Sequence, residues 1–393
     1  MKVFFGINES GVAYWRGKLP ALKMKKLGLC DVSMFSVYDT DPEKSDQMVK
    51  DADIVYCPSP CGIDSIVGYL KYYQDGKKTI ADYDDDLFNC HPFNPGYSTL
   101  GLKEVKIKVP DMEEQYLWQD GRMGFSIKDN VMRYKSHVDV LHVSTLITTT
   151  TDYLKDTLSK EIARPKDEFV IVPNAIDFDM FKPMPFRKRT GSKIRIGWTA
   201  SDSHMLEGQM MNQIVRKLYT KRQDFEFVIL GNIEKFKSSV KDIPIEWHPF
   251  CDISIYPAKI ASLELDIGIC PLDDFPFNHC KSALKWSEYS AFNIPSVCSD
   301  ITPYKLIEHG KDGMLASSVD DFVEKIETLM DDSILRKSIG QNAFERNYQD
   351  FNLDKVAYKW LDVFDRAMSI DKSLTYNGKL IPVINDRLQE VPV

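Results

Sequence analysis

Short apolar segments alternate with amphipathic segments along most of the chain. The short segments are rich in β-branched and aromatic residues, and in the first half they predict strands at residues 3–7, 32–37, 54–57, 79–83, 138–143 and 169–172. Segments with helical spacing lie between several of them, for example at 63–73 and 146–158. Nearly continuous apolar strands that alternate with helices indicate a parallel sheet covered on both faces.

The same alternation starts again after a proline-containing, basic segment at residues 183–195. It predicts strands at 193–198, 225–230, 245–248, 265–271 and 296–299, and helices at 205–220, 255–262, 278–292 and 319–330. We therefore expect two doubly wound α/β domains in tandem, the first over residues 1–185 and the second over residues 190–348.

Three segments do not fit this alternation. Residues 94–137 predict an insertion in the first domain, partly helical from Met112 onward, which could form a lid or face an acceptor. Two helices at 333–347 and 353–368 follow the second domain, and the last one is amphipathic with several aromatic residues. The tail at 371–393 has little periodicity.

Composition limits the class of protein. The 393 residues are 43% hydrophobic and 27% charged, which is ordinary for a soluble globular chain. The longest apolar runs have the length of a strand and fall short of the roughly 20 residues of a membrane span. The N-terminus reads as a first strand without signal-peptide features, and eight cysteines make no disulfide scaffold. We expect a cytoplasmic protein with reduced thiols.

The charge balance gives weak guidance about partners. Fifty basic and 58 acidic residues leave a net charge of −8, which argues against a protein that coats nucleic acid. A local basic track stays open, because five positive charges lie between Arg187 and Arg195, Arg189 among them. A solvated linker explains these charges as well.

The strongest candidate site covers residues 270–295, after a predicted buried strand. Asn278 is a plausible N-cap of the next helix, which puts Lys281 in the first turn, where a cation is unfavourable unless an anion binds there. Lys285 and Glu288 would share a helix face with Lys281. Two cations and a carboxylate suit a nucleoside diphosphate and its ribose, whereas a row of surface ion pairs is the plainer alternative.

The turn after the first strand of each domain carries small, hydroxyl and basic residues. Such turns let the backbone approach a phosphate, although they also occur as ordinary helix caps. The candidate donor-binding residues are Gly197, Trp198, Thr199 and Ser201 in the second domain and Gly11 and Arg16 in the first, with Tyr14 as a candidate acceptor contact.

A run of carboxylates at Asp82, Asp84, Asp85 and Asp86 follows a predicted strand of the first domain. These side chains could bind a divalent metal, hold sugar hydroxyls, act as a base or cap the next segment. The cysteines nearby do not have the spacing of common zinc sites. We expect no metal, with Asp84 and Asp85 in catalytic roles and Asp82 and Asp86 facing an acceptor.

Together these segments resemble the GT-B glycosyltransferases, in particular the retaining, glycogen-synthase-like group. The similarity rests on Val170–Asp177 with Phe181-Lys182-Pro183, on Phe227–Gly231, on Asp266–Pro271, on Lys285–Val297 and on the glycine-containing loop at 309–315. It covers about residues 165–365 well. The resemblance implies two facing Rossmann-like domains and a closing helix, within 350–370, that returns to the first domain.

The sequence departs from the family pattern in two respects. The group commonly has two glutamates eight residues apart, of which Glu288 matches the second, but Cys280 stands at the first. The sugar contact of the first glutamate is therefore missing or taken over, for instance by Asp273 or Asp274. The phosphate-binding pair of the family is also absent, so its role is assigned to Lys281 and Lys285. The carboxylate run followed by Leu87-Phe88-Asn89 is similar to members encoded by bacteriophages.

The resemblance implies an enzyme that transfers a hexosyl or pentosyl group from a nucleoside diphosphate sugar, by preference a UDP-sugar, to a hydroxyl acceptor with retention. The acceptor would be a saccharide or another small hydroxyl compound, and no cofactor is required. A phage enzyme that modifies 5-hydroxymethylpyrimidine bases of DNA in the host cytoplasm is the alternative. A nucleotide-sugar epimerase and a non-catalytic binder of sugar nucleotides also stay open.

Overall fold

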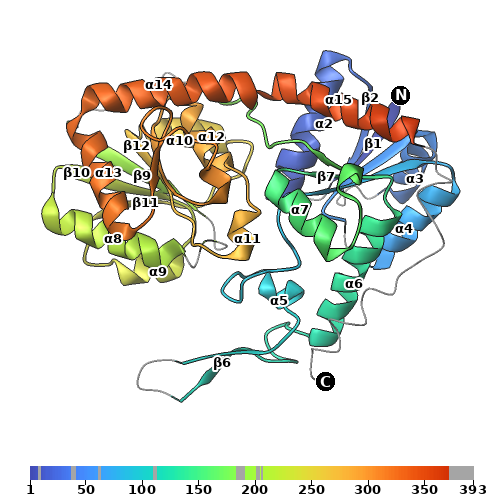
Figure 1. Cartoon of the computed structure of the whole chain (residues 1–393), viewed down its shortest axis with the longest axis horizontal. Helices are drawn as coiled ribbons and strands as arrows, with labels where there is room; N and C mark the ends of the chain where they lie inside the picture. Colours follow the sequence, from blue (N-terminus) through green and yellow to red (C-terminus); the bar gives the residue numbers. More distant parts are fainter. Residues whose placement is uncertain are drawn as a thin grey trace. The chain divides into compact units, whose positions relative to one another are not determined.

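The computed structural model describes residues 1–7, 10–36, 41–60, 63–108, 113–182, 191–200, 204 and 207–370. The chain forms two compact units (Figure 1). Unit 1 contains Met1–Pro173 and the C-terminal segment from Val356, and unit 2 contains Asn174–Lys355. Each unit has a six-stranded sheet whose neighbouring strands are parallel. The expected pair of doubly wound α/β domains is therefore confirmed. Residues 174–182, which the sequence analysis assigned to the first domain, group with unit 2.

The sheet of unit 1 has the strand order β2-β1-β3-β4-β7-β8. Its strands are β1 (Lys2–Ile7), β2 (Asp31–Ser36), β3 (Ile54–Pro58), β4 (Lys78–Tyr83), β7 (Leu146–Thr149) and β8 (Phe169–Ile171). The helical segments between them are α1 (Gly11–Ala13), the π-helix η1 (Tyr14–Lys18), α2 (Leu19–Leu27), α3 (Pro42–Asp51), α4 (Ile63–Gln74), α7 (Asp152–Glu161) and the 3₁₀ turn η2 (Lys166–Glu168).

The closing helix α15 (Leu353–Ser369) packs on the sheet of unit 1 through aromatic side chains. The ring of Trp360 lies 5.0 Å from that of Tyr56 in β3, and the ring of Phe364 lies 6.0 Å from that of Phe5 in β1. All four side chains are buried. From Val356 onward the helix therefore belongs to unit 1, as the resemblance implies.

The insertion of unit 1 is only partly helical. It contains α5 (Tyr97–Leu100), an antiparallel hairpin of β5 (Val105–Ile107) and β6 (Gln115–Trp118), and then α6 (Ile127–Val143). The expected helix from Met112 onward is wrong, because β6 occupies the segment that follows, and Met112 itself lies outside the described residues. As part of this strand, Trp118 packs on the ring of Phe125, with 5.8 Å between the ring centroids.

Two predicted elements of unit 1 have the opposite secondary structure from the one expected. Residues 138–143, expected as a strand, form the end of α6, and residues 146–149, expected to begin a helix, form β7. Residues 146–149 are fully buried, and residues 138–143 are buried except for the half-buried Asp139 and His142. In so short a run, three valines and a leucine favour a strand, and the helical spacing of the two polar residues is too short a signal to outweigh them.

The sheet of unit 2 has the order β11-β10-β9-β12-β13-β14, which is the Rossmann order 3-2-1-4-5-6. Its strands are β9 (Ile194–Thr199), β10 (Phe225–Leu230), β11 (Ile245–His248), β12 (Ile267–Cys270), β13 (Ser296–Ser299) and β14 (Met314–Ala316). The helical segments are α8 (Glu207–Lys221), α9 (Glu234–Ser239), α10 (Tyr256–Ser262), α11 (Pro276–His279), α12 (Leu284–Ser290), the 3₁₀ turn η4 (Thr302–Tyr304), α13 (Val319–Asp331) and α14 (Ser333–Asp350).

Two hydrophobic clusters hold unit 2 together on opposite faces of its sheet. One includes Trp198 and Ile196 with side chains of α8 and α13, and the other includes Val228 and Leu230 with side chains of α10 and α12. Because side chains alternate along a strand, neighbouring residues of β10, β12 and β13 belong to opposite clusters. The sheet is therefore buried on both faces, as continuous apolar strands predict.

Composition argued against a membrane span and against a disulfide scaffold, and the described part of the chain bears on both. None of its helices combines the length and apolar character that crossing a membrane requires. Its cysteines are all free thiols, three of them buried in unit 2.

Candidate functional site

The strand order of unit 2 changes direction between β9 and β12, and open α/β sheets bind ligands at the carboxyl ends of the strands beside such a point. Tyr289 of α12 lies beneath this point. The backbone N–H of Thr199, the last residue of β9, donates to the phenol oxygen of Tyr289 at 2.9 Å. Gly268 in β12 makes room for the ring, since a Cβ there would lie only 2.5 Å from its Cδ2 atom. The site is thus anchored to both strands.

A buried polar cluster adjoins Tyr289. The ammonium of Lys285 donates to Glu288 Oε2 at 2.6 Å and to the hydroxyl oxygen of Tyr256 at 3.0 Å. The Tyr256 hydroxyl donates to the same carboxylate oxygen at 2.8 Å, and Glu288 is only 3% exposed. The sequence analysis placed Lys285 and Glu288 on one helix face, and here they form a direct ion pair on α12.

The cluster has a defined charge state. Burial by itself would lower the pKa of Lys285, but the charge of Glu288 outweighs it and raises that pKa above its usual value. Burial, together with the charge of Glu288, raises the pKa of Tyr256 well above its usual value. Lys285 therefore stays a cation and Tyr256 stays a neutral hydroxyl at physiological pH. Such a set can hold both an anion and sugar hydroxyls.

The segment before α12 differs from the predicted single helix at 278–292. It consists of the short α11, a non-helical link and α12, so Asn278 lies inside α11 and Lys281 lies in the link. Lys281 therefore does not share a helix face with Lys285, and its ammonium lies 4.7 Å over the ring centroid of Phe277. The link is held from outside the helix, since Asn174 Nδ2 donates to Ser282 Oγ at 2.9 Å.

Asn278 ties the loop after β12 to α8. Its Nδ2 donates to Glu207 Oε1 at 2.9 Å and to the carbonyl oxygen of Asp273 at 3.0 Å. Burial would raise the pKa of Glu207, but the interactions with His204 and Asn278 outweigh it and lower that pKa. Burial and the charge of Glu207 raise the pKa of Asp273 to about 6. The loop therefore places Asp273, whose pKa is raised to about 6, beside the buried carboxylate of Glu207 in α8.

Replacing Asp273 by Asn should change how stability depends on pH. Because the folded-state pKa is raised, the native protein binds the proton more tightly than the unfolded chain, so wild-type stability falls as pH rises from about 4 to above 6. Asp273→Asn should remove this fall and be more stable above pH 6, by at most about 1 kcal/mol since the side chain is half exposed. Urea denaturation at pH 4.5 and 7.5 tests this, and equal pH dependence of both proteins would contradict it.

Within the described residues, the predicted turn after β9 contributes the contacts of Thr199 and the carbonyl oxygen of Gly197, which lies 3.4 Å from the hydroxyl oxygen of Tyr289. Thr199 lies at the strand end, 3.2 Å from the hydroxyl oxygen of Tyr256. Trp198 points into the other face of the sheet and packs on Phe236, with ring centroids 5.3 Å apart. At Gly197 a Cβ would lie 2.2 Å from Leu265, so this glycine serves packing. Ser201 lies outside the described residues.

In unit 1, Arg16 and Asp82 form a buried ion pair. The guanidinium donates to both carboxylate oxygens, at 3.0 and 2.6 Å, and to the carbonyl oxygen of Val172 at 2.7 Å. The hydroxyl of Thr148 donates to Asp82 at 2.6 Å, and both charged side chains are at most 1% exposed. These contacts join β4, β7 and the turn after β1 inside unit 1. We therefore leave Arg16 and Asp82 out of the proposed site.

The other candidates of unit 1 lie around the carboxyl ends of its strands. Gly11 opens α1, and the ring of Tyr14 lies 6.0 Å from that of Trp15. Asp84 and Asp85 follow β4 directly and are half-buried. Asp86 is buried and accepts hydrogen bonds from the backbone N–H of Phe88 and the amide of Asn89, as a cap does. Within the described ranges no three metal-ligating side chains converge.

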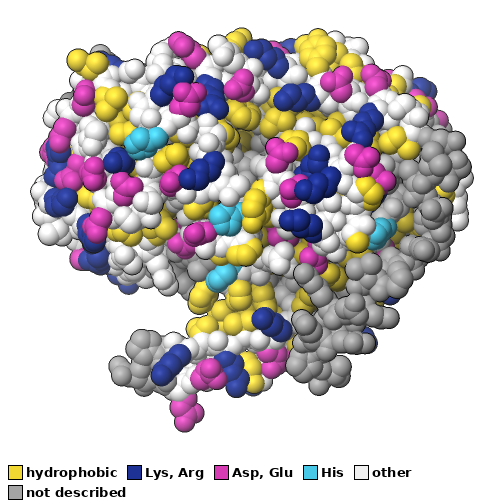
Figure 2. Space-filling view, in the orientation of Figure 1, with side chains coloured by type: hydrophobic (Ala, Val, Ile, Leu, Met, Phe, Trp, Pro, Cys, Tyr) yellow, Lys and Arg dark blue, Asp and Glu magenta, His cyan; other side chains and the backbone are white. Residues whose placement is uncertain are grey.

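The described part of the predicted basic track does not form a continuous basic surface. Arg187 and Arg189 lie outside the described residues. Arg195 is in β9 and buried, with its guanidinium bonded to Glu226 and Glu246. In Figure 2 the hairpin of the insertion carries basic and acidic side chains side by side, and Lys106 pairs with Glu114 at 3.7 Å.

Sequence reasoning missed three residues of the site. Tyr256, Tyr289 and Glu207 all come from helices whose existence was predicted, but no local motif marks them. Only the pairing of β9 with β12 brings these helices to one edge of the sheet. The one available signal was the glutamate at the first residue of an amphipathic helix. The sequence cannot distinguish such a residue from an ordinary acidic side chain that stabilises the first turn of a helix.

Comparison with known families gives one match. Residues 202–332, about a third of the chain and all within unit 2, match the family described as glycosyl transferases group 1. A comparison with curated protein sequences found no match. The expectation of a glycosyltransferase is confirmed at this level.

Comparison with solved structures confirms the GT-B fold. A glycosyltransferase from Rickettsia africae is 12% identical with a TM-score of 0.65, over 94% of this chain and 99% of that chain. HepE from Anabaena, solved with UDP and glucose, is 12% identical with a TM-score of 0.63, over 93% and 100%. Sucrose-phosphate synthase from Thermosynechococcus elongatus is 11% identical with a TM-score of 0.63, over 94% and 99%.

Proposed function

We propose that this chain transfers a sugar from a nucleoside diphosphate sugar, by preference a UDP-sugar, to a hydroxyl group of a saccharide or another small compound, and that it does so with retention. The observation that carries the proposal is the cluster of Lys285, Glu288 and Tyr256 at the switch point of unit 2. It combines a cation with a buried carboxylate in a domain that matches group 1 glycosyl transferases.

Glu288 would receive the ribose of the donor. A carboxylate has two oxygens with about four acceptor positions. The hydrogen bonds from Lys285 and Tyr256 both go to Oε2, so Oε1 can accept from ribose hydroxyls. Tyr256 and Lys285 hold the carboxylate in one orientation. A preorganised acceptor of this kind loses little entropy when the ligand binds.

The diphosphate would lie against Lys285 and Lys281. Lys285 stays protonated beside Glu288, and Lys281 comes from the link between α11 and α12. When the bond between the anomeric carbon and the phosphate oxygen breaks, negative charge develops on the diphosphate. Fixed cations stabilise that charge in the transition state more than in the ground state, which lowers the barrier. Asn278 and Asp273, held by Glu207, would face the donor sugar.

Two considerations support UDP as the nucleotide and retention as the outcome. HepE, which shares the fold over nearly its whole length, has been solved with UDP-glucose. The sequence resembles the retaining, glycogen-synthase-like group at Asn174–Asp177 and Glu288. Cys280, where that group has its first glutamate, is fully buried and therefore offers no substitute contact on the surface.

We assign the acceptor to unit 1, where Asp84 and Asp85 follow β4 and could hold a hydroxyl or take its proton. A saccharide is the preferred acceptor. The alternative is a bacteriophage enzyme that glucosylates hydroxymethylated DNA, which would need a basic track. The lysines of the hairpin are interleaved with acids, which disfavours this alternative.

Transfer of radiolabelled sugar tests the proposal. Purified protein is incubated with labelled UDP-glucose, UDP-N-acetylglucosamine or GDP-mannose, and with oligosaccharides, hydroxymethylated duplex DNA or unmodified duplex as acceptors. Label on an oligosaccharide supports the proposal, and label only on hydroxymethylated DNA selects the phage alternative. Conversion of the donor to an epimer, or donor binding without any turnover, would replace the proposal by the epimerase or the non-catalytic binder.

Activity should not depend on a divalent metal. Lys281 and Lys285 supply the positive charge that a metal would otherwise bring to the diphosphate, so 5 to 10 mM EDTA (an order-of-magnitude excess over any contaminating metal) should leave turnover unchanged. Dialysis against chelator followed by the transfer assay with and without Mn²⁺ checks this. Loss of activity that Mn²⁺ restores would instead assign a metal to the carboxylates at Asp84 and Asp85.

A further inference from the structure

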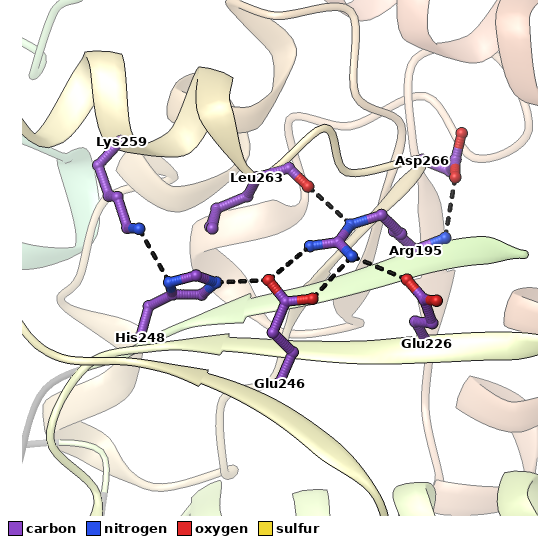
Figure 3. Close-up of polar contacts among 7 residues, drawn as sticks. All are labelled: Arg195, Glu226, Glu246, His248, Lys259, Leu263 and Asp266. Atoms are coloured by element: carbon purple, nitrogen blue, oxygen red, sulfur yellow. Dashed lines mark hydrogen bonds and ion pairs between the residues drawn. The ribbon is translucent and has the colours of Figure 1, made fainter. Parts of the chain in front are cut away.

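Helix α10 of unit 2 is held by polar contacts at its beginning, in its middle and at its end, and Figure 3 shows those of its middle and its end. Tyr256, its first residue, contacts Glu288, Lys285 and Thr199. Lys259 in its middle donates to Nδ1 of His248 at 2.8 Å. The carbonyl oxygen of Leu263, which caps its end, accepts from Arg195 Nε at 2.8 Å. A helix of seven residues has little stability of its own, so these contacts decide where it lies.

The last two contacts belong to one charged network. Arg195 donates to both carboxylate oxygens of Glu246, at 2.8 and 2.9 Å, and to Glu226 at 2.8 Å. The ring of His248 donates from Nε2 to Glu246 Oε1 at 2.6 Å. We call Arg195, Glu226, Glu246, His248 and Lys259 the α10 network. It lies on three adjacent strands and reaches the helix from the sheet.

The network is matched to the sheet register. Arg195 pairs with Glu226 across β9 and β10, and Glu246 and His248 alternate on β11, so all four side chains leave the same face of the sheet. That face is covered by α10 and α12. Arg195 is buried, while the two glutamates remain partly exposed. The hydrogen bond from Arg195 lowers the pKa of Glu246 to about 2, so this carboxylate is ionised under physiological conditions.

We propose that the α10 network is a positioning device for the donor site, which holds α10 so that Tyr256 keeps Glu288 and Lys285 in the geometry that binds the nucleotide. This inference rests on the function proposed above. None of the network residues is assigned a contact with substrate. They act through α10, with Tyr256 as the residue that transmits their effect.

The contact of His248 with Lys259 depends on one protonation state. An ammonium can only donate, so Nδ1 of His248 must accept and its proton must sit on Nε2, where it is donated to Glu246. The charged groups that face the ring are Glu246 on its own strand and Lys259 on α10, with Arg195 behind Glu246. The two contacts of the ring therefore fix its tautomer and join β11 to the middle of α10.

Two variants of His248 separate positioning from simple stabilisation. His248→Ala removes both contacts of the ring. His248→Gln offers Lys259 a carbonyl oxygen and Glu246 an N–H, and it cannot be protonated. The matched control is His309→Ala, which removes a ring that accepts from the backbone N–H of Leu315 and has no recorded contact with α10.

Binding of UDP measured by isothermal titration calorimetry at pH 7.5 gives the first readout. His248→Ala should weaken UDP binding by roughly three- to tenfold. This corresponds to the contribution of about one hydrogen bond to the preorganisation of the site. His248→Gln should bind like wild type, since it restores both contacts of the ring. Wild-type affinity in His248→Ala, or equal weakening in His309→Ala, would overturn the proposal.

The double variant His248→Ala/Tyr256→Phe tests the route. If His248 acts through Tyr256, the double variant should bind UDP no more weakly than Tyr256→Phe alone. Additive losses would mean that His248 affects the site by another route, which overturns the role given to α10.

Hydrogen exchange of the unliganded protein keeps this inference separate from the proposed function. His248→Ala should speed exchange in α10 and in α12 together, since both helices share the Tyr256 contact. Faster exchange confined to β11 contradicts the proposal. If wild type binds no UDP, the proposed function fails, while the exchange result still decides whether the network positions α10.

Discussion

Replacing Lys285 by Met should reduce turnover at least about tenfold and weaken binding of the donor. The methionine keeps the length and packing of the side chain but removes the cation that lies 2.6 Å from Glu288. Loss of a charge-assisted contact to the leaving group raises the transition state more than the ground state, so kcat should fall as well as kcat/KM. Steady-state kinetics with the donor found in the transfer assay measures both.

The same change also leaves Glu288 buried without its partner. Removing one member of a buried pair costs about 3 kcal/mol or more, so folding must be checked before a kinetic effect is interpreted. Lys217→Met is a matched control, because Lys217 forms an equally short but exposed pair with Asp320. If folded Lys285→Met turns over as fast as wild type, the role of Lys285 at the diphosphate is wrong.

Replacing Arg16 by Met should destabilise unit 1 by about 3–5 kcal/mol. The guanidinium neutralises Asp82 in a place where neither side chain reaches solvent, and it also bonds the carbonyl oxygen of Val172 and lies 5.0 Å over the ring of Trp360. Methionine fills the space but leaves the buried carboxylate of Asp82 without a cation, although it still accepts from the hydroxyl of Thr148. Urea denaturation monitored by tryptophan fluorescence measures the change.

The control for this experiment is Arg216→Met. Arg216 makes an equally short pair with Asp242 on the surface of unit 2, with both side chains exposed. Exposed pairs contribute about 0–1 kcal/mol, so this variant should unfold almost like wild type. Equal losses in Arg16→Met and Arg216→Met would show that the pair with Asp82 is not the internal tie of unit 1.

The alternation of apolar strands and helices was sufficient to predict both parallel sheets. It failed for residues 138–143, whose three valines favour a strand. They end α6, because the helix begins far upstream at its cap Ser126 and continues through them. The hairpin of β5 and β6 was also missed, since its pairing depends on contacts with α5 and Phe125 rather than on a local turn motif.

Part of the candidate site followed from local spacing, and part could not. Lys285 and Glu288 are three residues apart, so their proximity on a helix is a local property. Arg16 and Asp82 are 66 residues apart, and nothing in either segment indicates that they pair in a core instead of binding an anion or an acceptor. Tyr256 reaches Glu288 only because β9 and β12 are neighbours in the sheet. Long-range pairing therefore decided which charged residues are available for a ligand.

Calorimetric titration of UDP into wild type and Glu288→Ala tests the central claim most directly. If the carboxylate of Glu288 binds the ribose, its loss should cost about 2–3 kcal/mol of binding free energy, which corresponds to a roughly 30- to 150-fold weaker Kd. Thermal unfolding without ligand shows whether the variant is folded. We predict that wild type binds UDP and that folded Glu288→Ala binds it with this loss of affinity. The same Kd in both proteins would contradict the account.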